Sequence, residues 1–436
     1  MKRLLIANRG EIALRIQRAC AELGIETVAA YTRADNNLLH LALADRTVCI
    51  GETSYLDGGQ LLAAALTHGC DALHPGYGLL SEDAGFAAMV EEHGLTFVGP
   101  TPQQVELMGD KARARETLAG AGIPVLPGSE GAVGNADAAR QVAAEIGYPV
   151  LLKASHGGGG RGIVVVEAPA ALESAMKKVA AEADAFFGRA DFYLEKYLPD
   201  SRHIEIQVAG DGLGRVIHLG ARECSIQRRH QKLIEESPPP GISASDLNQL
   251  ALLCCETLAG LNYRNAGTLE FLYAENAFYF IEMNTRIQVE HPVTEVLTGQ
   301  DLVKLQLQLA AGEPLSLEQV DIEGRGHAIE CRINAEDENF VPSPGPVDVL
   351  KIPGGMGVRF DSHLYAGYTV PHYYDSLLGK LIVTGRDREE AIARMKRALI
   401  ELKIEPIANN VPLHLQVLSD SDFVAARLST RFLERH

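Results

Sequence analysis

The sequence predicts a multidomain protein that combines an α/β region with an α+β region. The chain has 436 residues, which is too long for one ordinary hydrophobic core. Up to about residue 98, apolar strand-like runs alternate with amphipathic helix-like runs, a pattern typical of a mostly parallel sheet. From about residue 199, several strand-like segments follow one another with only occasional helices, which indicates an α+β region.

These patterns divide the chain into five stretches. An N-terminal α/β domain covers residues 1–98, and a glycine- and proline-rich breaker then opens a helical linker at 99–124. The small glycine-rich unit at 125–198 has the profile of a mobile lid. A larger α+β region spans 199–325, and a β-rich region with terminal helices completes the chain at 326–436.

Each expected element follows from its periodicity. In the N-terminal domain a strand is expected at 2–7, a helix at 11–23 and a strand at 25–31, and a helix near 103–121 fills the linker. The turn at 8–11 lacks the G-x-G-x-x-G dinucleotide fingerprint. The expected lid elements are strands at 149–154, 163–167 and 191–197 and a helix at 169–185. Beyond the lid, strands are expected at 203–209, 215–224, 266–273, 277–284 and 326–332, and helices near 245–260, 299–311, 387–402 and 409–418.

Composition excludes several classes of function. The net charge of −17 argues against sequence-independent binding of nucleic acid, which needs clustered lysine and arginine. The seven cysteines show neither metal-type spacing nor a disulfide framework, which fits a reducing compartment. The apolar run at the start is too short for a signal peptide, and no stretch approaches a membrane span. A cytoplasmic protein without a membrane partner is expected.

Polar side chains occupy every second position from Glu282 to Glu290, directly after an apolar run. A strand sends alternate side chains to opposite faces, so Glu282, Asn284 and Arg286 share one face. Gln288 and Glu290 join that face if the extended geometry persists. Magnesium prefers hard oxygen ligands that it shares with substrate phosphates, and an arginine fork binds a small planar anion. The alternative is a surface strand laced with salt bridges.

A glycine-rich loop joins two of the predicted strands in the lid. It runs from Lys153 to Gly162 and contains four consecutive glycines, which let backbone amides approach phosphate groups. The lysine precedes the glycines and a strand follows them, so the loop is not a P-loop. Lys111, at the start of a helix, is a second candidate phosphate contact. The alternative for the loop is a plain flexible hairpin.

Three further segments indicate a nucleotide or anion site. The strand end at 195–198 precedes a break between two lobes, a suitable place for an adenine base. His203 alternates with other polar residues on a strand and is equally well explained as a phosphate ligand or a structural histidine. The basic cluster from Arg228 to Lys232 predicts a cationic wall around phosphate or bicarbonate, with a solvated loop as the alternative.

Taken together, these motifs closely resemble biotin carboxylase, the ATP-grasp component of biotin-dependent carboxylases. The likeness extends from the motif at 6–13 through 74–78 to 373–380, and the run EMNTRIQVEHPVTE at 282–295 is highly specific to the family. The resemblance implies an ATP-grasp fold with a Rossmann-like N-terminal domain, a glycine-rich lid and a β-rich C-terminal domain. His156 departs from it, since close relatives often have glycine there.

The resemblance also implies roles for individual residues. The implied ATP contacts are Lys111, Lys153, Gly159, Gly160, Glu195, Lys196, Tyr197, Leu198, His203, Gln227 and His230. The implied ligands of two Mg²⁺ (or Mn²⁺) ions are Glu270, Glu282 and Asn284. The implied bicarbonate contacts are Lys232, Arg286, Gln288 and the backbone of Val289. Glu290 is implied as the base that deprotonates bicarbonate, and Arg332 as the cation that steadies the biotin enolate.

The implied activity is ATP- and bicarbonate-dependent carboxylation of biotin through carboxyphosphate. The expected partners are a separate biotin carboxyl carrier protein, carboxyltransferase subunits and a second copy of the chain. The segment at 332–337 favours the acetyl-CoA carboxylase branch, which supplies malonyl-CoA for fatty acid synthesis. The alternatives are a subunit of another acyl-CoA carboxylase, a different ATP-grasp ligase, or a nucleotide-sensing regulatory subunit.

Overall fold

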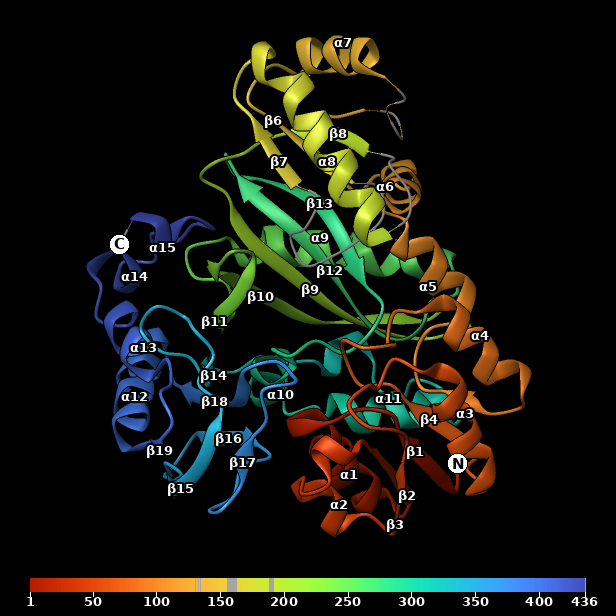
Figure 1. Cartoon of the computed structure of the whole chain (residues 1–436). Helices are drawn as coiled ribbons and strands as arrows, with labels where there is room; N and C mark the ends of the chain where they lie inside the picture. The colour runs from red at the N-terminus through yellow and green to blue at the C-terminus, as the bar shows by residue number, and fades with distance from the viewer. Residues whose placement is uncertain (130, 132, 134, 155–162, 188–191, 436) are drawn as a thin grey trace.

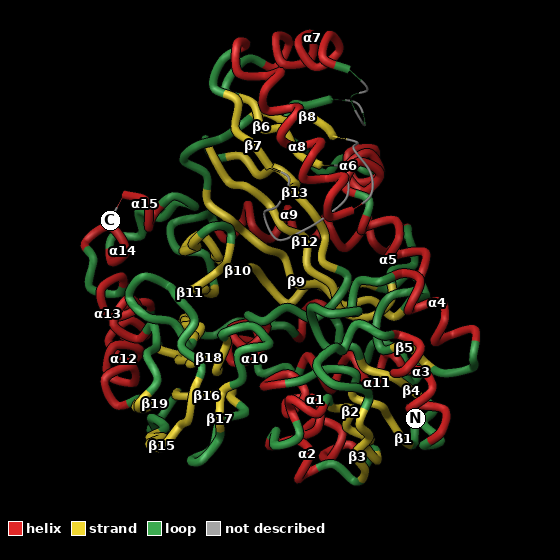
Figure 2. Tube along the Cα trace, in the orientation of Figure 1, coloured by secondary structure: helices red, strands yellow, loops and turns green. Residues whose placement is uncertain are grey.

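The computed structural model describes residues 1–435 except 130, 132, 134, 155–162 and 188–191. Three lobes surround a long central sheet (Figure 1). The N-terminal lobe lies at the lower right, the small lobe of α7, α8 and β6–β8 at the top, and the C-terminal helices at the left. Figure 2 shows the strands of the central sheet running beneath the small lobe. Within the described residues, no helix is long and apolar enough to span a membrane.

The N-terminal lobe is the expected α/β domain. Its five strands pair in the order β3-β2-β1-β4-β5, and all of the pairings are parallel. The strands are β1 (Arg3–Ile6), β2 (Glu26–Tyr31), β3 (Arg46–Cys49), β4 (Ala72–His74) and β5 (Thr96–Phe97). The helices are α1 (Gly10–Leu23), α2 (Leu39–Leu43), α3 (Gly58–Thr67) and α4 (Ala84–Glu92). The carboxyl ends of β1 and β4 meet where the strand order reverses, the usual place for polar site residues in such sheets.

The single helix expected near 103–121 is two helices, α5 (Pro102–Gly109) and α6 (Lys111–Gly120). Asp110 has extended backbone angles, and its carboxylate accepts hydrogen bonds from the first amides of α6. An aspartate at this position satisfies amides that lack a partner inside the helix. The break places Lys111 at the first turn of α6.

The small lobe has the expected strands and one helix that the sequence did not predict. β6 (Val150–Ala154) pairs with β7 (Ile163–Val166) and with β8 (Phe192–Lys196), both antiparallel. The expected helix is α8 (Leu172–Phe187), preceded by a short 3-10 turn, η2 (Pro169–Ala171). The unexpected helix is α7 (Ala136–Ile146). Most of the glycine loop, including Gly159, Gly160 and His156, lies outside the described residues.

The central sheet has eight strands in the order β13-β12-β9-β10-β11-β14-β18-β16, and its neighbouring strands pair antiparallel. It therefore continues across the boundary expected at residue 325. Its strands are β9 (Arg202–Asp211), β10 (Val216–Arg228), β11 (Gln231–Ser237), β12 (Arg264–Ala274), β13 (Ala277–Asn284), β14 (His327–Asn334), β16 (Val358–Ser362) and β18 (Leu377–Gly385). The five domain ranges remain predictions.

Helices and a second small sheet cover the central sheet. The helix expected near 299–311 is α11 (Leu302–Ala310), and a separate helix, α10 (His291–Thr298), ends at Gly299 with φ of 71°. The other helices are α9 (Ala244–Gly260), α12 (Arg388–Glu401), α13 (Val411–Val417), α14 (Ser421–Val424) and α15 (Phe432–Arg435), with a 3-10 turn, η3 (Gln319–Asp321). A sheet in the order β17-β15-β19 comprises β15 (Gly345–Lys351), β17 (Thr369–Val370) and β19 (Lys403–Pro406). Apolar side chains fill the space between these layers, so that polar side chains inside the sheet stand out as exceptions.

Candidate active site

Charged residues from neighbouring strands of the central sheet gather on one face. Glu270 on β12 lies directly opposite Glu282 on β13 and Glu205 on β9. Gln227 on β10 lies opposite Lys232 on β11. Directly opposed residues of paired strands project to the same face, so the sheet itself collects these side chains.

The extended geometry expected from Glu282 to Glu290 ends at Asn284. The chain then bends, and Glu290 becomes the residue that precedes α10, with φ of −81° and ψ of 7°. The expectation that Arg286 shares a strand face with Glu282 and Asn284 is therefore wrong, and the condition on which Gln288 and Glu290 would join that face is not met. A proline in the first turn of α10 fits a helix start, and the bend returns both side chains to the site. Gln288 donates to Glu270 at 2.7 Å.

Lys232 lies at the centre of the cluster. Its ammonium group contacts Glu205, lies 2.8 Å from Glu270 Oε1 and lies 2.8 Å from Glu290 Oε1. Burial opposes the charge, but the three carboxylates raise the pKa of Lys232 well above its usual value. The solvated-loop alternative is wrong for this residue, since Lys232 belongs to β11. The residues before it do form a turn, in which Arg229 and His230 have φ of 48° and 65°.

Glu270 connects the proposed metal ligands to the rest of the cluster. Asn284 Nδ2 donates to its Oε1 at 2.8 Å, and His203 Nε2 lies 3.0 Å from its Oε2. Burial opposes ionisation of Glu270, but Lys232 and His203 hold its pKa well below the usual value. Burial alone would lower the pKa of His203, whereas Glu270 raises it to about 9. The imidazole Nε2 thus lies between the carboxylates of Glu270 and Glu205, and Gln227 Nε2 lies 3.1 Å from the other ring nitrogen.

Arg286 is held from both sides. Its Nε donates to Glu82 Oε2 at 2.9 Å, and its NH2 group donates to Asn284 Oδ1 at 2.7 Å. Glu82 comes from the N-terminal lobe, where it precedes α4, and its Oε1 also accepts from the Thr285 amide at 3.1 Å. The loop that carries Arg286 is therefore fixed by a carboxylate more than 200 residues away.

Glu290 lies between two cations. Arg332 on β14 donates to Glu290 Oε2 at 3.0 Å, opposite the oxygen that accepts from Lys232. Burial opposes ionisation of Glu290, but Lys232 and Arg332 lower its pKa, so the carboxylate is ionised and able to accept a proton. Arg332 also donates to Glu235 at 2.6 Å. Burial raises the pKa of Glu235 to about 7 despite this arginine.

The linker and the small lobe add two further lysines. Lys111 lies 2.7 Å from Glu282 Oε2, and its charge is the main reason that the pKa of Glu282 is lowered. Lys153 on β6 lies 2.6 Å from Glu195 on β8 and also lowers the pKa of Glu282. Side chains from three separate regions therefore converge on the carboxylates of β12 and β13.

In the segment at 195–198, which is expected to bind adenine, several polar groups already make hydrogen bonds to neighbouring residues. Lys196 Nζ donates to the carbonyls of Gly147 and Tyr148 at 2.9 and 3.2 Å. The Tyr197 amide donates to the carbonyl of Pro149 at 3.2 Å, and the Leu198 carbonyl accepts from Ser201 at 3.0 Å. These contacts fix the path of the strand end.

Two buried residues of the site were missed from the sequence. Arg222 on β10 is fully buried, and its guanidinium bonds Glu205 at 2.8 Å and Gln288 at 2.5 Å. Glu205, on the same strand face as His203, accepts from both Arg222 and Lys232. The signal was a charged residue in the interior of each strand, since buried charge requires a partner.

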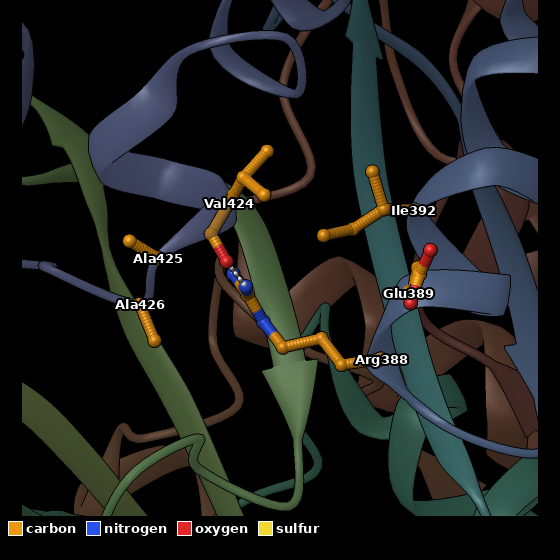
Figure 3. Close-up of a pocket in the computed structure, with 6 residues that line it drawn as sticks. All are labelled: Arg388, Glu389, Ile392, Val424, Ala425 and Ala426. Carbon is orange, nitrogen blue, oxygen red and sulfur yellow. Dashed lines mark hydrogen bonds between the residues drawn. The ribbon is translucent and has the colours of Figure 1, made fainter.

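A hollow of about 440 Å³ lies elsewhere, between α12 and α14 (Figure 3). It is lined by Arg388, Glu389, Ile392, Val424, Ala425 and Ala426. Arg388 donates to the Val424 carbonyl at 2.9 Å and to Glu236 at 2.7 and 2.9 Å. Its guanidinium is thus already engaged, and the hollow contains none of the predicted site residues.

This sheet, its glycine-rich small lobe and the buried lysine–carboxylate cluster define an ATP-grasp type of enzyme. The family model "Biotin carboxylase, N-terminal domain" matches residues 1–105, and "Biotin carboxylase C-terminal domain" matches 330–435. Between them, "Carbamoyl-phosphate synthase L chain, ATP binding domain" matches residues 110–318.

Curated proteins named biotin carboxylase are similar to this chain over its full length. Biotin carboxylase of Haemophilus influenzae is 53% identical and covers 100% of this chain and 98% of the relative. Biotin carboxylase 1 of Bacillus subtilis is 51% identical, and the match covers 100% of this chain and 99% of the relative. The Campylobacter jejuni biotin carboxylase complex with β,γ-ATP has a TM-score of 0.98 at 46% identity, with 100% and 99% covered.

A second solved structure is the biotin carboxylase domain dimer of the Hydrogenobacter thermophilus 2-oxoglutarate carboxylase, in complex with MgADP, ADP and bicarbonate. It has a TM-score of 0.97 at 47% identity and covers 100% of this chain and 97% of its own. The chain belongs to the biotin carboxylase family and is an ATP-dependent ligase.

Proposed function

We propose that this protein carboxylates biotin on a separate biotin carboxyl carrier protein, as the first half-reaction of acetyl-CoA carboxylase. The observation that carries the proposal is the position of Glu290, a buried carboxylate held between Lys232 and Arg332. A base there lies between one cation suited to bicarbonate and one suited to biotin. Curated bacterial relatives named biotin carboxylase are matched over 98% or 99% of their own length, which supports action on a separate carrier.

The proposed cofactors are ATP and two Mg²⁺ (or Mn²⁺) ions. Glu270 and Glu282 would hold one ion, and Glu282 with Asn284 the second. The donor set fits, since carboxylate and amide oxygens converge there from adjacent strands, and the ions would take the place of the lysine contacts on these carboxylates. Bound ions would neutralise phosphate charge during phosphoryl transfer. Lys111, Lys153, His203 and His230 would bind the phosphates, with Gly159 and Gly160 of the glycine loop.

The rest of the nucleotide contacts follow the family pattern. The segment Glu195, Lys196, Tyr197 and Leu198 would hold the adenine, and Gln227 would orient His203 toward the nucleotide. Relatives solved with ADP and with an ATP analogue support this assignment. Burial and the Lys153 charge lower the pKa of His230, so its imidazole is available as a neutral hydrogen-bonding group.

Bicarbonate would be bound by Lys232, Arg286, Gln288 and the backbone of Val289. Bicarbonate is a poor electrophile, and ATP would activate it as carboxyphosphate. Glu290, ionised at neutral pH, would take the bicarbonate proton while Lys232 and Arg286 hold the anion. Glu82 now occupies the Nε–H of the guanidinium, so the anion would be bound through the remaining N–H groups of Arg286.

Biotin would then react beside Arg332. Carboxyphosphate yields carbon dioxide and phosphate, and phosphate removes the weakly acidic ureido proton. The resulting enolate needs a permanent cation opposite its oxygen, and arginine supplies one at any working pH. Arg332 is already oriented by Glu235 and Glu290, so its charge is fixed before the substrate arrives.

The expected partners are a biotin carboxyl carrier protein, carboxyltransferase subunits and a second copy of this chain. The Hydrogenobacter relative is a dimer, which supports self-association here. Relatives of similar identity serve 2-oxoglutarate carboxylase and pyruvate carboxylase, so another acyl-CoA or oxo-acid branch is the alternative to acetyl-CoA carboxylase. The transferase partner selects the final acceptor.

The decisive experiment measures ADP release with magnesium and ATP, with and without bicarbonate and free biotin. Strong stimulation by biotin that disappears without bicarbonate is the expected result. Turnover indifferent to biotin would indicate a different ATP-grasp ligase. Tight ATP binding without turnover would favour a regulatory subunit.

A further inference from the structure

Lys380 is a buried lysine that the proposed mechanism does not use. It lies on β18 directly opposite Arg332 on β14, and its side chain is fully buried. Its ammonium group lies 2.9 Å from Glu11 Oε1 and donates to the Val289 carbonyl at 2.8 Å. A buried ammonium group is costly to retain without a purpose that an apolar side chain cannot serve.

The two acceptors come from different parts of the molecule. Glu11 is in the first turn of α1, at the carboxyl end of β1, and the Tyr77 hydroxyl donates to the same oxygen of Glu11. Val289 belongs to the bend between β13 and α10. Lys380 therefore connects the N-terminal lobe, the central sheet and the turn that carries Glu290.

The Val289 carbonyl is joined to the Glu290 amide in one peptide group. A peptide group is planar, so a hydrogen bond that fixes the carbonyl also fixes the nitrogen and Cα of Glu290. The Glu290 side chain then extends toward Lys232 and Arg332. The amide of Val289, a proposed bicarbonate contact, is attached to the same Cα as this carbonyl.

The nearby acid Glu330 makes no hydrogen bond to the lysine. It is fully buried on β14, two residues before Arg332, and neither of its carboxylate oxygens has a hydrogen-bond partner among the described residues. Burial raises its pKa well above the usual value, although the charge of Lys380 opposes the shift. The hydrogen bonds of Lys380 are therefore directed to Glu11 and Val289.

We propose that Lys380, held by Glu11, is a positioning residue that sets the orientation of the Val289–Glu290 peptide and thereby aligns the base with bicarbonate. The inference rests on the proposed function of Glu290 and adds a contact behind it. A purely structural interdomain ion pair would stabilise the fold without discriminating between substrates.

The test compares Lys380→Met, Lys380→Arg and Glu11→Gln with the wild-type protein in biotin-stimulated ADP release. Lys380→Met should lower kcat about 30-fold and raise the KM for bicarbonate about fivefold, while the KM for ATP changes less than twofold. Lys380→Arg keeps a charged donor and should recover part of the loss. Glu11→Gln keeps a neutral acceptor and should shift the same two parameters by a few fold.

Arg264→Met is the matched control. Arg264 also joins the N-terminal lobe to the central sheet, since it donates to Glu91 at 2.5 Å and to the Gly99 carbonyl at 3.0 Å. Neither contact involves Glu290 or a residue that binds Glu290. Arg264→Met should lower the melting temperature and leave the bicarbonate KM unchanged. Equal loss in all kinetic parameters, no loss, or failure of both Lys380→Met and Glu11→Gln to fold would overturn the proposal. Absence of biotin-stimulated turnover in the wild type would instead refute the proposed function.

Discussion

Two buried groups of charges in this molecule are built differently. In the N-terminal lobe, Arg9 donates two parallel hydrogen bonds to Asp35, at 2.5 and 2.9 Å, and Tyr55 donates to the same carboxylate at 3.1 Å. The Arg9 guanidinium also stacks on the Tyr374 ring at 3.9 Å. In the candidate site, Lys232 is shared by three carboxylates instead. In the first group one cation pairs with one anion, whereas in the second one ammonium group is shared by three carboxylates, two of which also bind an arginine.

The difference shows how a buried charge can be either fixed or exchangeable. A guanidinium fork matches a carboxylate in one plane, so the Arg9 pair has one preferred geometry. An ammonium group has no preferred plane and can pass from one oxygen to another. The Lys232 cluster is thus suited to change partners when phosphate and bicarbonate enter, and the Arg9–Asp35 pair is suited to hold one geometry within the N-terminal lobe.

Removing the shared cation should have the largest effect. Lys232→Met leaves Glu205, Glu270 and Glu290 without their common partner, so like charges repel in a buried site. We expect kcat for biotin-stimulated ADP release to fall about 1000-fold and the free energy of unfolding to fall by about 3 kcal/mol. Steady-state kinetics and urea unfolding measure the two effects.

The control is Lys177→Met, which removes an exposed lysine of α8 whose side chain is 78% accessible. It should change neither quantity measurably, because exposed ion pairs contribute little. If Lys232→Met behaved like Lys177→Met, the shared-cation account of the site would be wrong.

Arg332→Ala should separate the two ends of the site. Loss of the cation opposite the biotin enolate should reduce biotin carboxylation about 100-fold. Nucleotide affinity should stay within about twofold, since the lysines that face the proposed phosphate site are untouched. Binding of a fluorescent ATP analogue and biotin-dependent turnover are the two measurements. Equal loss of both would contradict the assignment of Arg332 to biotin.

Asp35→Asn tests the fixed pair. It should lower the free energy of unfolding by about 3 kcal/mol, because Arg9 is left with a neutral partner in a buried place. The kcat per folded molecule should change less than twofold. The measurement is urea unfolding combined with turnover normalised to folded protein. A collapse of kcat in the folded variant would erase the distinction between the two groups.

The sequence predicted most elements and many of the side chains that the structure brings together, but not how they are brought together. Alternation placed Glu282 and Asn284 correctly on one strand, because periodicity is a local property, whereas Arg286 lies beyond the end of that strand. The bend after Asn284 and the break at Asp110 depend on a proline and a helix cap that a continuous periodic reading passes over. Arg222 was missed because its partners lie 15 to 72 residues away in the sequence.

Two adjacent glutamates on β11 test the comparison between the candidate site and a fixed ion pair with the smallest expected effect. Glu235 and Glu236 project to opposite faces of the sheet. Burial raises the pKa of Glu235 from 4.5 to about 7, although Arg332 opposes the shift. Burial also disfavours ionisation of Glu236, but hydrogen bonds from His327 and a bidentate Arg388 lower its pKa. One carboxyl belongs to the site and the other to a fixed pair.

The two shifts predict opposite pH dependence of stability. The stability that protonated Glu235 contributes is lost as the pH rises from 4.5 to about 7, because the unfolded chain releases that proton first. Glu235→Gln stays neutral, so relative to the wild type its free energy of unfolding should be higher by about 2 kcal/mol at pH 8 and unchanged at pH 4.5.

Glu236 contributes stability above its unfolded pKa of 4.5, which is lost as the pH falls through its lower folded pKa. Glu236→Gln should therefore destabilise the protein at pH 7 and have less effect in acid. Urea unfolding of both variants from pH 4.5 to 8 should give free-energy differences of opposite sign at neutral pH, whereas equal signs would mean that the two faces of β11 hold their charges in the same way.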